Sequence, residues 1–278
     1  MHKNRNLAFH LYMALFLAYL LIPLIIMGGA AFNDSKLPTV YPWKGYTDQW
    51  FIDLWNDNRI WIAFRNTILV AVAVAAISVP IGTAAAILIN SLGGRIRSAL
   101  YGIMVAPILA PGAVIGISTL LFWNKFSVPA GLHLSVLGQV SYIAAFVMLL
   151  VLARLQSFDH SLEEAALDLG ATHSQVMRRI MLPHLYPAIG AGAAIAFFQS
   201  IENFNITLFT RGNADTLTVY VFSKVRSGIT PTINALALLL ILFTLGLAVW
   251  YELNRRRKAR IEAAREAEGR RAEEAALL

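Results

Sequence analysis

The sequence predicts an all-α integral membrane protein with six membrane-spanning helices, and three observations carry this expectation. Hydrophobic residues make up 58% of the 278 residues and charged residues only 14%, whereas soluble domains usually carry about a quarter charged residues. The mean hydropathy is +0.61. Six apolar stretches are also long enough to form bilayer-crossing helices, each of which needs about 20 residues.

The predicted spans follow one another along most of the chain. The first, preceded by Lys3 and Arg5, is too long for the apolar part of a cleaved signal peptide and is expected to remain as a span. Proline and glycine inside the second and third spans are compatible with membrane helices. Residues 41–61 alternate aromatic residues with aspartate, as an interfacial helix does. The six spans are 8–31, 63–89, 99–123, 134–153, 187–209 and 233–251.

The distribution of Lys and Arg predicts that both termini are cytoplasmic. With the N-terminus inside, the cytoplasmic segments hold 15 of the 23 basic residues and the external segments hold 8. Residues 1–7 then form a cytoplasmic N-terminal tail, 8–253 the six-span domain and 254–278 a basic cytoplasmic C-terminal tail. That tail holds eight of the 23 basic residues, so membrane lipid rather than nucleic acid is its expected partner.

The predicted cytoplasmic connection between spans four and five, residues 161–185, is unusually polar for this chain. Ser161 and Glu164 have the spacing of a capping box, which predicts the start of a short helix. Gly170 is expected to end that helix, since glycine is favoured just beyond a helix terminus.

A second short helix is expected to follow, capped by Thr172 or Ser174 and stopped by Pro183. Taken by periodicity alone, the segment is equally compatible with an amphipathic loop lying on the membrane surface. Its spacing favours two short helices at an angle, hinged at Gly170.

The full spacing of this segment resembles a known signature. Glu164-Ala165-Ala166 is followed after three residues by Gly170 and after nine more by Ile180-Met181-Leu182-Pro183. This is similar to the EAA signature, EAA-x3-G-x9-I-x-LP, of the membrane subunits of binding-protein-dependent ABC importers. The resemblance implies the type I ABC importer permease fold, with 161–185 as the cytoplasmic EAA coupling segment that docks on an ATPase subunit. The implied coupling residues are Glu164, Ala165, Ala166, Gly170, Ile180, Leu182 and Pro183.

The chain lacks the motifs of an enzyme. It has no G-x-x-x-x-G-K-[ST] phosphate loop, and the Gly-Gly pair at 93–94 has no Lys-Ser or Lys-Thr after it. No carboxylate pair suits hydrolysis, there is no cysteine, and the six histidines lack close metal-ligand spacing. His173 and His184 are expected as interface or solvated residues. The sequence therefore predicts a transport subunit with no catalytic residue, metal or cofactor, served by a separate ATPase.

The order of features narrows the resemblance. The Trp-rich segment 41–61, APILAPG at 106–112 and INALALLL at 233–240 look like the second permease subunit of spermidine/putrescine importers. Implied partners are cytoplasmic ABC ATPase subunits, a second, different permease subunit and a periplasmic or lipid-anchored solute-binding protein. That binding protein is a second possible contact for segment 41–61. The implied location is the bacterial inner membrane. Other small organic solutes and ferric iron remain alternative substrates.

The fifth span contains polar residues that indicate a substrate pathway. An ionised Glu202 inside the bilayer costs roughly 2.5–3.5 kcal/mol on insertion scales, so it is expected to face a wet pathway or a partner. Interhelical hydrogen bonding of Glu202 is the alternative. Polyamine permeases commonly carry an acidic pair where this chain has Glu202-Asn203, and this departure leaves the solute open. The candidate pathway residues are Gln199, Glu202, Asn203 and Asn205, with Pro107 and Pro111 as kinks that could form a gate.

Two further interpretations concern the surroundings of Glu202. Phe204 and Phe209 are candidates for cation–π contact with a cationic solute. An ion-driven secondary transporter remains the rival function, but such a protein is expected to carry matched intramembrane acids and broken helices in both halves. The sequence offers Glu202 without a partner acid in another span.

Overall fold

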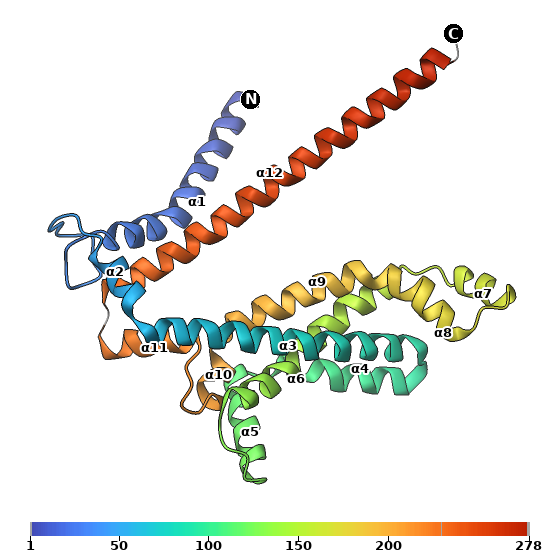
Figure 1. Cartoon of the computed structure of the whole chain (residues 1–278), viewed down its shortest axis with the longest axis horizontal. Helices are drawn as coiled ribbons and strands as arrows, with labels where there is room; N and C mark the ends of the chain where they lie inside the picture. The colour runs from blue at the N-terminus through green and yellow to red at the C-terminus, as the bar shows by residue number, and fades with distance from the viewer. Residues whose placement is uncertain (1, 229, 277–278) are drawn as a thin grey trace. The chain divides into compact units, whose positions relative to one another are not determined.

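The computed structural model describes residues 2–228 and 230–276, with side chains over 9–228 and 230–262 (Figure 1). Residue 1 of the predicted N-terminal tail and residues 277–278 of the predicted C-terminal tail therefore lie outside the described residues. The fold is helical, and the only β-type pairing in the described part of the chain is an isolated bridge between Asn33 and Tyr46. The helices form two compact units, one made by the chain up to Asp57 and from Lys224 onward, the other by Asn58–Ser223.

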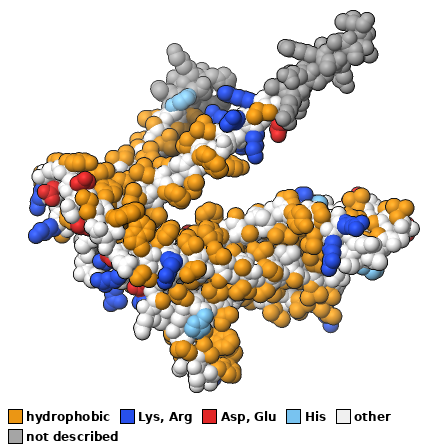
Figure 2. Space-filling view, viewed as in Figure 1, with side chains coloured by type: hydrophobic (Ala, Val, Ile, Leu, Met, Phe, Trp, Pro, Cys, Tyr) orange, Lys and Arg blue, Asp and Glu red, His pale blue; other side chains and the backbone are white. Residues whose placement is uncertain are grey.

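The prediction of six apolar spans is confirmed in number. Five helices are long and apolar enough to cross a membrane, and a bent helix pair makes a sixth when it is counted as one span. The five helical ranges are Phe9–Ala30, Asn58–Ser91, Leu132–Leu155, His173–Ile201 and Pro231–Glu262. Hydrophobic side chains cover much of the visible face of α3 and α9 in the second unit, as expected of helices that face lipid or another apolar surface (Figure 2).

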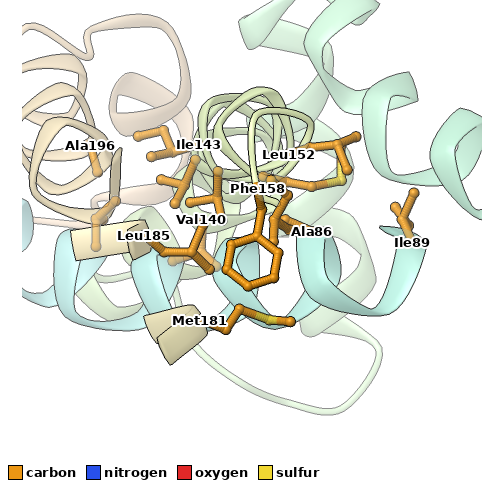
Figure 3. Close-up of a cluster of buried hydrophobic side chains, with 14 of the residues drawn as sticks. Ala86, Ile89, Val140, Ile143, Leu152, Phe158, Met181, Leu185 and Ala196 are labelled. Atoms are coloured by element: carbon orange, nitrogen blue, oxygen red, sulfur yellow. The ribbon is translucent and has the colours of Figure 1, made fainter. Parts of the chain in front are cut away.

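The second unit is built on three helices that share one apolar core. These are α3 (Asn58–Ser91), α6 (Leu132–Leu155) and α9 (Leu182–Ile201). Glycine allows the close approach of α3 and α6, because a Cβ at Gly82 would lie 2.5 Å from the Ala144 carbonyl oxygen. The buried core includes Val74, Val147, Met148, Leu185 and Ala196, part of which Figure 3 shows.

The third span, predicted over 99–123 with kinks at Pro107 and Pro111, is broken into two helices. It consists of α4 (Gly94–Leu109) and α5 (Gly112–Asn124), which are bent by 104° relative to each other. Pro107 lies in the last turn of α4, and Pro111 directly precedes α5. Proline lacks the amide hydrogen that would carry a helix across this point, and it disfavours helical geometry in the residue before it.

The fifth span lies further toward the N-terminus than predicted. Helix α8 (His173–Val176), a π-helical turn η1 (Met177–Met181) and α9 form one continuous helix that ends at Ile201, not at residue 209. The prediction that Pro183 stops the second cytoplasmic helix is therefore wrong. Pro183 stands in the first turn of α9, where the amide hydrogen is least needed.

Two short helices follow the fifth span, where the sequence predicted the end of that span and then a loop. They are α10 (Asn205–Thr210) and α11 (Leu217–Ser227). The segment from Glu202 to Phe204 separates α9 from α10. Both the third and the fifth apolar stretches are thus interrupted.

The first unit contains α1 (His2–Ala30), α2 (Gln49–Asn56) and α12 (Pro231–Ala276). Helix α12 continues from the sixth span into the predicted C-terminal tail without a break. The loop after α1 is organised by the buried side chain of Asn33, which donates to the Thr39 carbonyl (2.8 Å) and accepts from the Lys44 amide (2.8 Å). The aromatic segment 41–61 is only partly helical, because α2 and the first turn of α3 occupy its second half and residues 41–48 lie outside any helix.

Candidate functional site

The first helix of the predicted coupling segment 161–185, α7 (Ser161–Asp168), begins differently from the prediction. The Ser161–Glu164 capping box is wrong, since no side chain of that pair caps the helix. The Asp159 carboxylate accepts the Ser161 backbone N–H instead, at 2.9 Å. Hydrogen bonds from the Ser161 hydroxyl and backbone amide lower the pKa of Asp159 below its ordinary value. The residue two positions earlier thus supplies the cap.

Gly170 ends α7 as predicted. Its φ of +87° lies in the left-handed region. The Ala171 amide donates to the Ala166 carbonyl at 3.0 Å, and the Gly170 amide donates to the Leu167 carbonyl at 2.9 Å. This pair of hydrogen bonds is the Schellman motif, in which glycine avoids the steric penalty of positive φ.

Of the two residues predicted to cap the next helix, Thr172 is the one that does. Its hydroxyl accepts the Gln175 amide, and the Gln175 side chain accepts the Thr172 amide at 2.8 Å, which makes a complete capping box. Val176 and Met181 are buried, so the start of this helix is anchored to the core. The hinge at Gly170 is consequently held between two independently capped helices.

Segment 161–185 is also attached to the second unit by residues that the sequence reasoning missed. Phe158 is buried in the core of the second unit and lies beside Met181 and Leu185 in Figure 3. Its ring makes an edge contact with His184 at 5.3 Å between centroids. The Arg154 side chain donates to the His184 carbonyl at 3.1 Å. His184 therefore packs within the chain and is not a purely solvated residue.

The predicted coupling residues divide into an exposed and an inward group. Glu164, Ala165 and Pro183 are exposed, and Leu169 is exposed to 89%. Ile180 packs against the core, and Ala166 and Leu182 are half-buried. Leu162 of α7 is exposed as well, so apolar side chains stand on the outer surface of this segment.

A small cavity lies beside this segment, where the ends of α3 and α6 meet α7 and α8. It has a volume of about 300 Å³. His160 and Glu163 approach to 3.6 Å at its edge, and His173 also lines it. His173 is thus placed at the junction of α7 and α8.

A larger polar cavity lies where the broken third span meets the break after α9. Its volume is about 390 Å³. The two breaks bring together residues that are about a hundred positions apart in the sequence. Five of the six predicted pathway residues line it, and Pro111 is the exception. The lining is formed by Pro107, Ile108, Ala110, Gly112, Ile115, Tyr142, Phe146, Gln199, Glu202, Asn203, Phe204, Asn205 and Ile206.

Glu202 supplies the carboxylate of this cavity. Its side chain is exposed, and it accepts no hydrogen bond from any residue that the structure describes. The alternative that Glu202 is held by interhelical hydrogen bonds therefore finds no donor in this part of the chain. Phe204 lines the cavity and packs on Phe222 with 4.7 Å between ring centroids, whereas Phe209 does not line it.

Asn203 has a structural role that the sequence did not predict. Its side-chain amide donates to the Tyr142 hydroxyl on α6 at 2.8 Å. Its side-chain oxygen accepts the Ile206 amide at 3.2 Å, which satisfies an amide at the start of α10. One side chain therefore joins α6 to the break between α9 and α10.

Behind the cavity, a buried polar ladder holds the break in place. Gln139 is fully buried, donates to the Thr207 hydroxyl at 2.9 Å and accepts the Ser200 hydroxyl at 2.5 Å. The hydroxyls of Ser135 and Thr210 meet at 2.8 Å. The sequence does carry a signal for this ladder: Ser135 and Gln139 lie four residues apart in an apolar span, and polar side chains in such a span need hydrogen-bond partners on other helices.

Glycines allow α10 to pack closely against the neighbouring helices. A Cβ at Gly116 of α5 would lie 3.0 Å from the Ile206 carbonyl oxygen, and one at Gly138 of α6 would lie 2.8 Å from the Ile206 side chain. Larger residues at these positions would push α10 away. The geometry of the cavity thus depends on glycine at these two positions as well as on the polar contacts.

Apolar spans interrupted around a polar cavity, with a hinged helical segment at one end, define a membrane-embedded transport subunit. Interrupted helices in membranes are tolerated where they line a wet cavity. The chain belongs to the family of binding-protein-dependent transport system inner membrane components, whose model matches residues 78–260. It is therefore a multi-pass inner-membrane permease subunit of an ABC importer.

Individual relatives agree with this assignment. The putrescine transport system permease protein PotI of Escherichia coli K12 is 35% identical over 253 residues, covering 87% of this chain and 89% of the relative. The spermidine/putrescine transport system permease protein PotC of Haemophilus influenzae is 30% identical over 237 residues, covering 85% and 91% respectively. Both matches extend over nearly the whole of each chain.

Solved structures confirm the fold. A bacterial ABC transporter involved in import of the acidic polysaccharide alginate has a chain that matches with a TM-score of 0.70 at 19% identity, covering 91% of this chain and 96% of that chain. A chain of the MetNI methionine ABC transporter matches with a TM-score of 0.56 at 18% identity, covering 69% and 95%. The type I importer permease fold expected from the sequence is therefore confirmed.

Proposed function

We propose that this subunit forms half of the translocation pathway of a polyamine importer, with putrescine or spermidine as solute. The observation that carries the proposal is the polar cavity with the exposed carboxylate of Glu202. A polyamine is a multiply charged cation, and the Glu202 carboxylate, which has no ion-pair partner among the described residues, attracts it. The names of the relatives PotI and PotC support the same class of solute.

Aromatic walls suit the same solute. Tyr142, Phe146 and Phe204 line the cavity together with Glu202. A cation over an aromatic face gains about 0.5–2 kcal/mol, with the larger values at desolvated sites. An alkylammonium chain would meet both a counter-charge and apolar surface there.

The cytoplasmic segment 161–185 is proposed to couple this pathway to a separate ATPase. The exposed surface of α7, with Glu164, Ala165 and Leu169, would dock on the ATPase, and Gly170 would set its angle to the following helix. Because that helix runs without a break into α9, a displacement of α7 can be carried directly to Ile201, beside the cavity. The chain itself hydrolyses no ATP in this proposal.

The complete importer would contain a second, different permease subunit, two ATPase subunits and a periplasmic or lipid-anchored binding protein. Both termini would lie in the cytoplasm, with residues 8–253 as the transport domain and 254–278 as a basic tail near anionic lipid. Purification of an active transporter with this subunit as a homodimer would contradict the heterodimer.

The test of the polyamine proposal is uptake by the complete importer carrying Glu202→Gln. This change keeps the size of the side chain and removes its charge. We expect roughly a tenfold or greater loss of putrescine or spermidine uptake, because an attraction of about 1.4 kcal/mol or more corresponds to that factor. Glu252→Gln, which removes an acid on α12 outside the cavity, is the matched control and should leave uptake unchanged.

Uptake of different labelled solutes by the wild-type importer distinguishes the alternative substrates. If ferric iron or another organic solute is transported and a polyamine is not, the polyamine proposal is wrong. Uptake driven by an ion gradient without ATPase subunits would instead support a secondary transporter.

A further inference from the structure

The polar cavity contains a single carboxylate. Its remaining polar lining consists of amides and one phenol: Gln199, Asn203, Asn205 and Tyr142. The rest of the lining is apolar, with isoleucine and phenylalanine among its members. The lining therefore offers one carboxylate, that of Glu202, to a cationic solute.

The position next to Glu202 decides whether a second charge is present. The orientation of the Asn203 amide follows from its contacts: its oxygen accepts the Ile206 amide at 3.2 Å, so its NH2 group faces the Tyr142 hydroxyl, at 2.8 Å. An aspartate has nearly the same shape and could keep both contacts, because the Tyr142 hydroxyl can donate to a carboxylate. The fold thus accepts either residue, whereas the cavity charge differs by one.

We infer that Asn203 is a specificity-determining residue, which limits the cavity to one fixed negative charge and so favours a diamine over a longer, more highly charged polyamine. This inference rests on the proposed polyamine function and deepens it. One carboxylate balances one ammonium group at a time. Each further ammonium in the cavity would lose hydration without gaining a counter-charge, with only aromatic faces to compensate it.

The experiment compares uptake of labelled putrescine and labelled spermidine by the complete importer carrying Asn203→Asp. We expect the spermidine-to-putrescine uptake ratio to rise roughly tenfold, since a second carboxylate acts more strongly on the more highly charged solute. A merely structural role of Asn203 would lower uptake of both solutes and leave their ratio unchanged.

Two further variants make the result interpretable. Asn205→Asp adds a charge to the same cavity without touching the Tyr142 contact, because Asn205 lines the cavity with an exposed side chain. It should raise the ratio in the same direction, also if Asn203→Asp fails to assemble. Asn124→Asp places the same charge at the exposed end of α5, outside the cavity, and should leave the ratio unchanged.

The outcomes separate this inference from the function on which it rests. A raised ratio in Asn203→Asp, with no change in Asn124→Asp, supports the inference; where Asn203→Asp does not assemble, a raised ratio in Asn205→Asp supports it instead. An unchanged ratio in an assembled Asn203→Asp importer, or in Asn205→Asp where Asn203→Asp does not assemble, overturns the inference and leaves the function standing, provided that the wild-type importer transports polyamines. A wild-type importer that transports no polyamine overturns the proposed function itself.

Discussion

Gly170 offers the most direct test of the hinge between α7 and α8. Its φ of +87° is a conformation that residues with a Cβ rarely adopt, but a Cβ built there would meet no atom within 4 Å. The effect of Gly170→Ala therefore comes from the backbone alone. For L-residues the left-handed conformation costs roughly 1–2 kcal/mol. Such a difference reduces the population of the native hinge by a factor of about 5 to 30.

We expect Gly170→Ala to insert and assemble normally but to import solute several-fold more slowly than the wild type. The measurement is uptake and solute-stimulated ATP hydrolysis by the reconstituted importer, normalised to the amount of assembled complex. Gly170→Asn is the matched control, because asparagine tolerates positive φ better than other residues with a Cβ. Its uptake should lie between those of the wild type and the alanine variant.

The ranking of the three proteins is the critical result. Wild-type uptake by Gly170→Ala would show that the hinge conformation does not limit coupling. Equal loss in the alanine and asparagine variants would show that something other than backbone strain is responsible, such as direct contact between the partner and the space beside Gly170.

Two further predictions concern the packing that supports the cavity. Gly82→Ala should lower the free energy of unfolding of the purified subunit by about 1–3 kcal/mol, since overpacking at a helix contact costs this much. Gly190→Ala is the control and should be neutral, because a Cβ there meets nothing within 4 Å; equal melting temperatures for the two variants would contradict the reasoning. Gln139→Leu should lower the free energy of unfolding of the subunit by about 1–3 kcal/mol for each buried hydroxyl that loses its partner. Ser141→Ala is the control and should change stability little, because its hydroxyl bonds only within its own helix. An unchanged melting temperature for Gln139→Leu would refute a structural role of the polar ladder.

The sequence by itself determined the features that depend on local composition and spacing. Apolar length predicts a span because a helix satisfies its own backbone hydrogen bonds in lipid. Gly170 could be predicted as a helix end for a similarly local reason, since the preference for glycine at positive φ is a property of one residue. The seven positions of the coupling signature likewise depend only on spacing along the chain. These features are the membrane class, the number of spans, the hinge and the family.

Tertiary structure alone decided where the spans break and what the breaks bring together. The sequence marked Pro107 and Pro111 as kinks, but proline does not fix the angle, which follows from the packing of α10 against α5 at Gly116 and against α6 at Gly138. The end of α9 at Ile201 depends on Gln139 and Tyr142, more than fifty residues away, which hold Ser200 and Asn203. The cap by Asp159 and the anchor at Phe158 were missed because competing local partners and burial are resolved only in space. The site depends on such long-range contacts because a buried polar group is stable only where another segment supplies its partner.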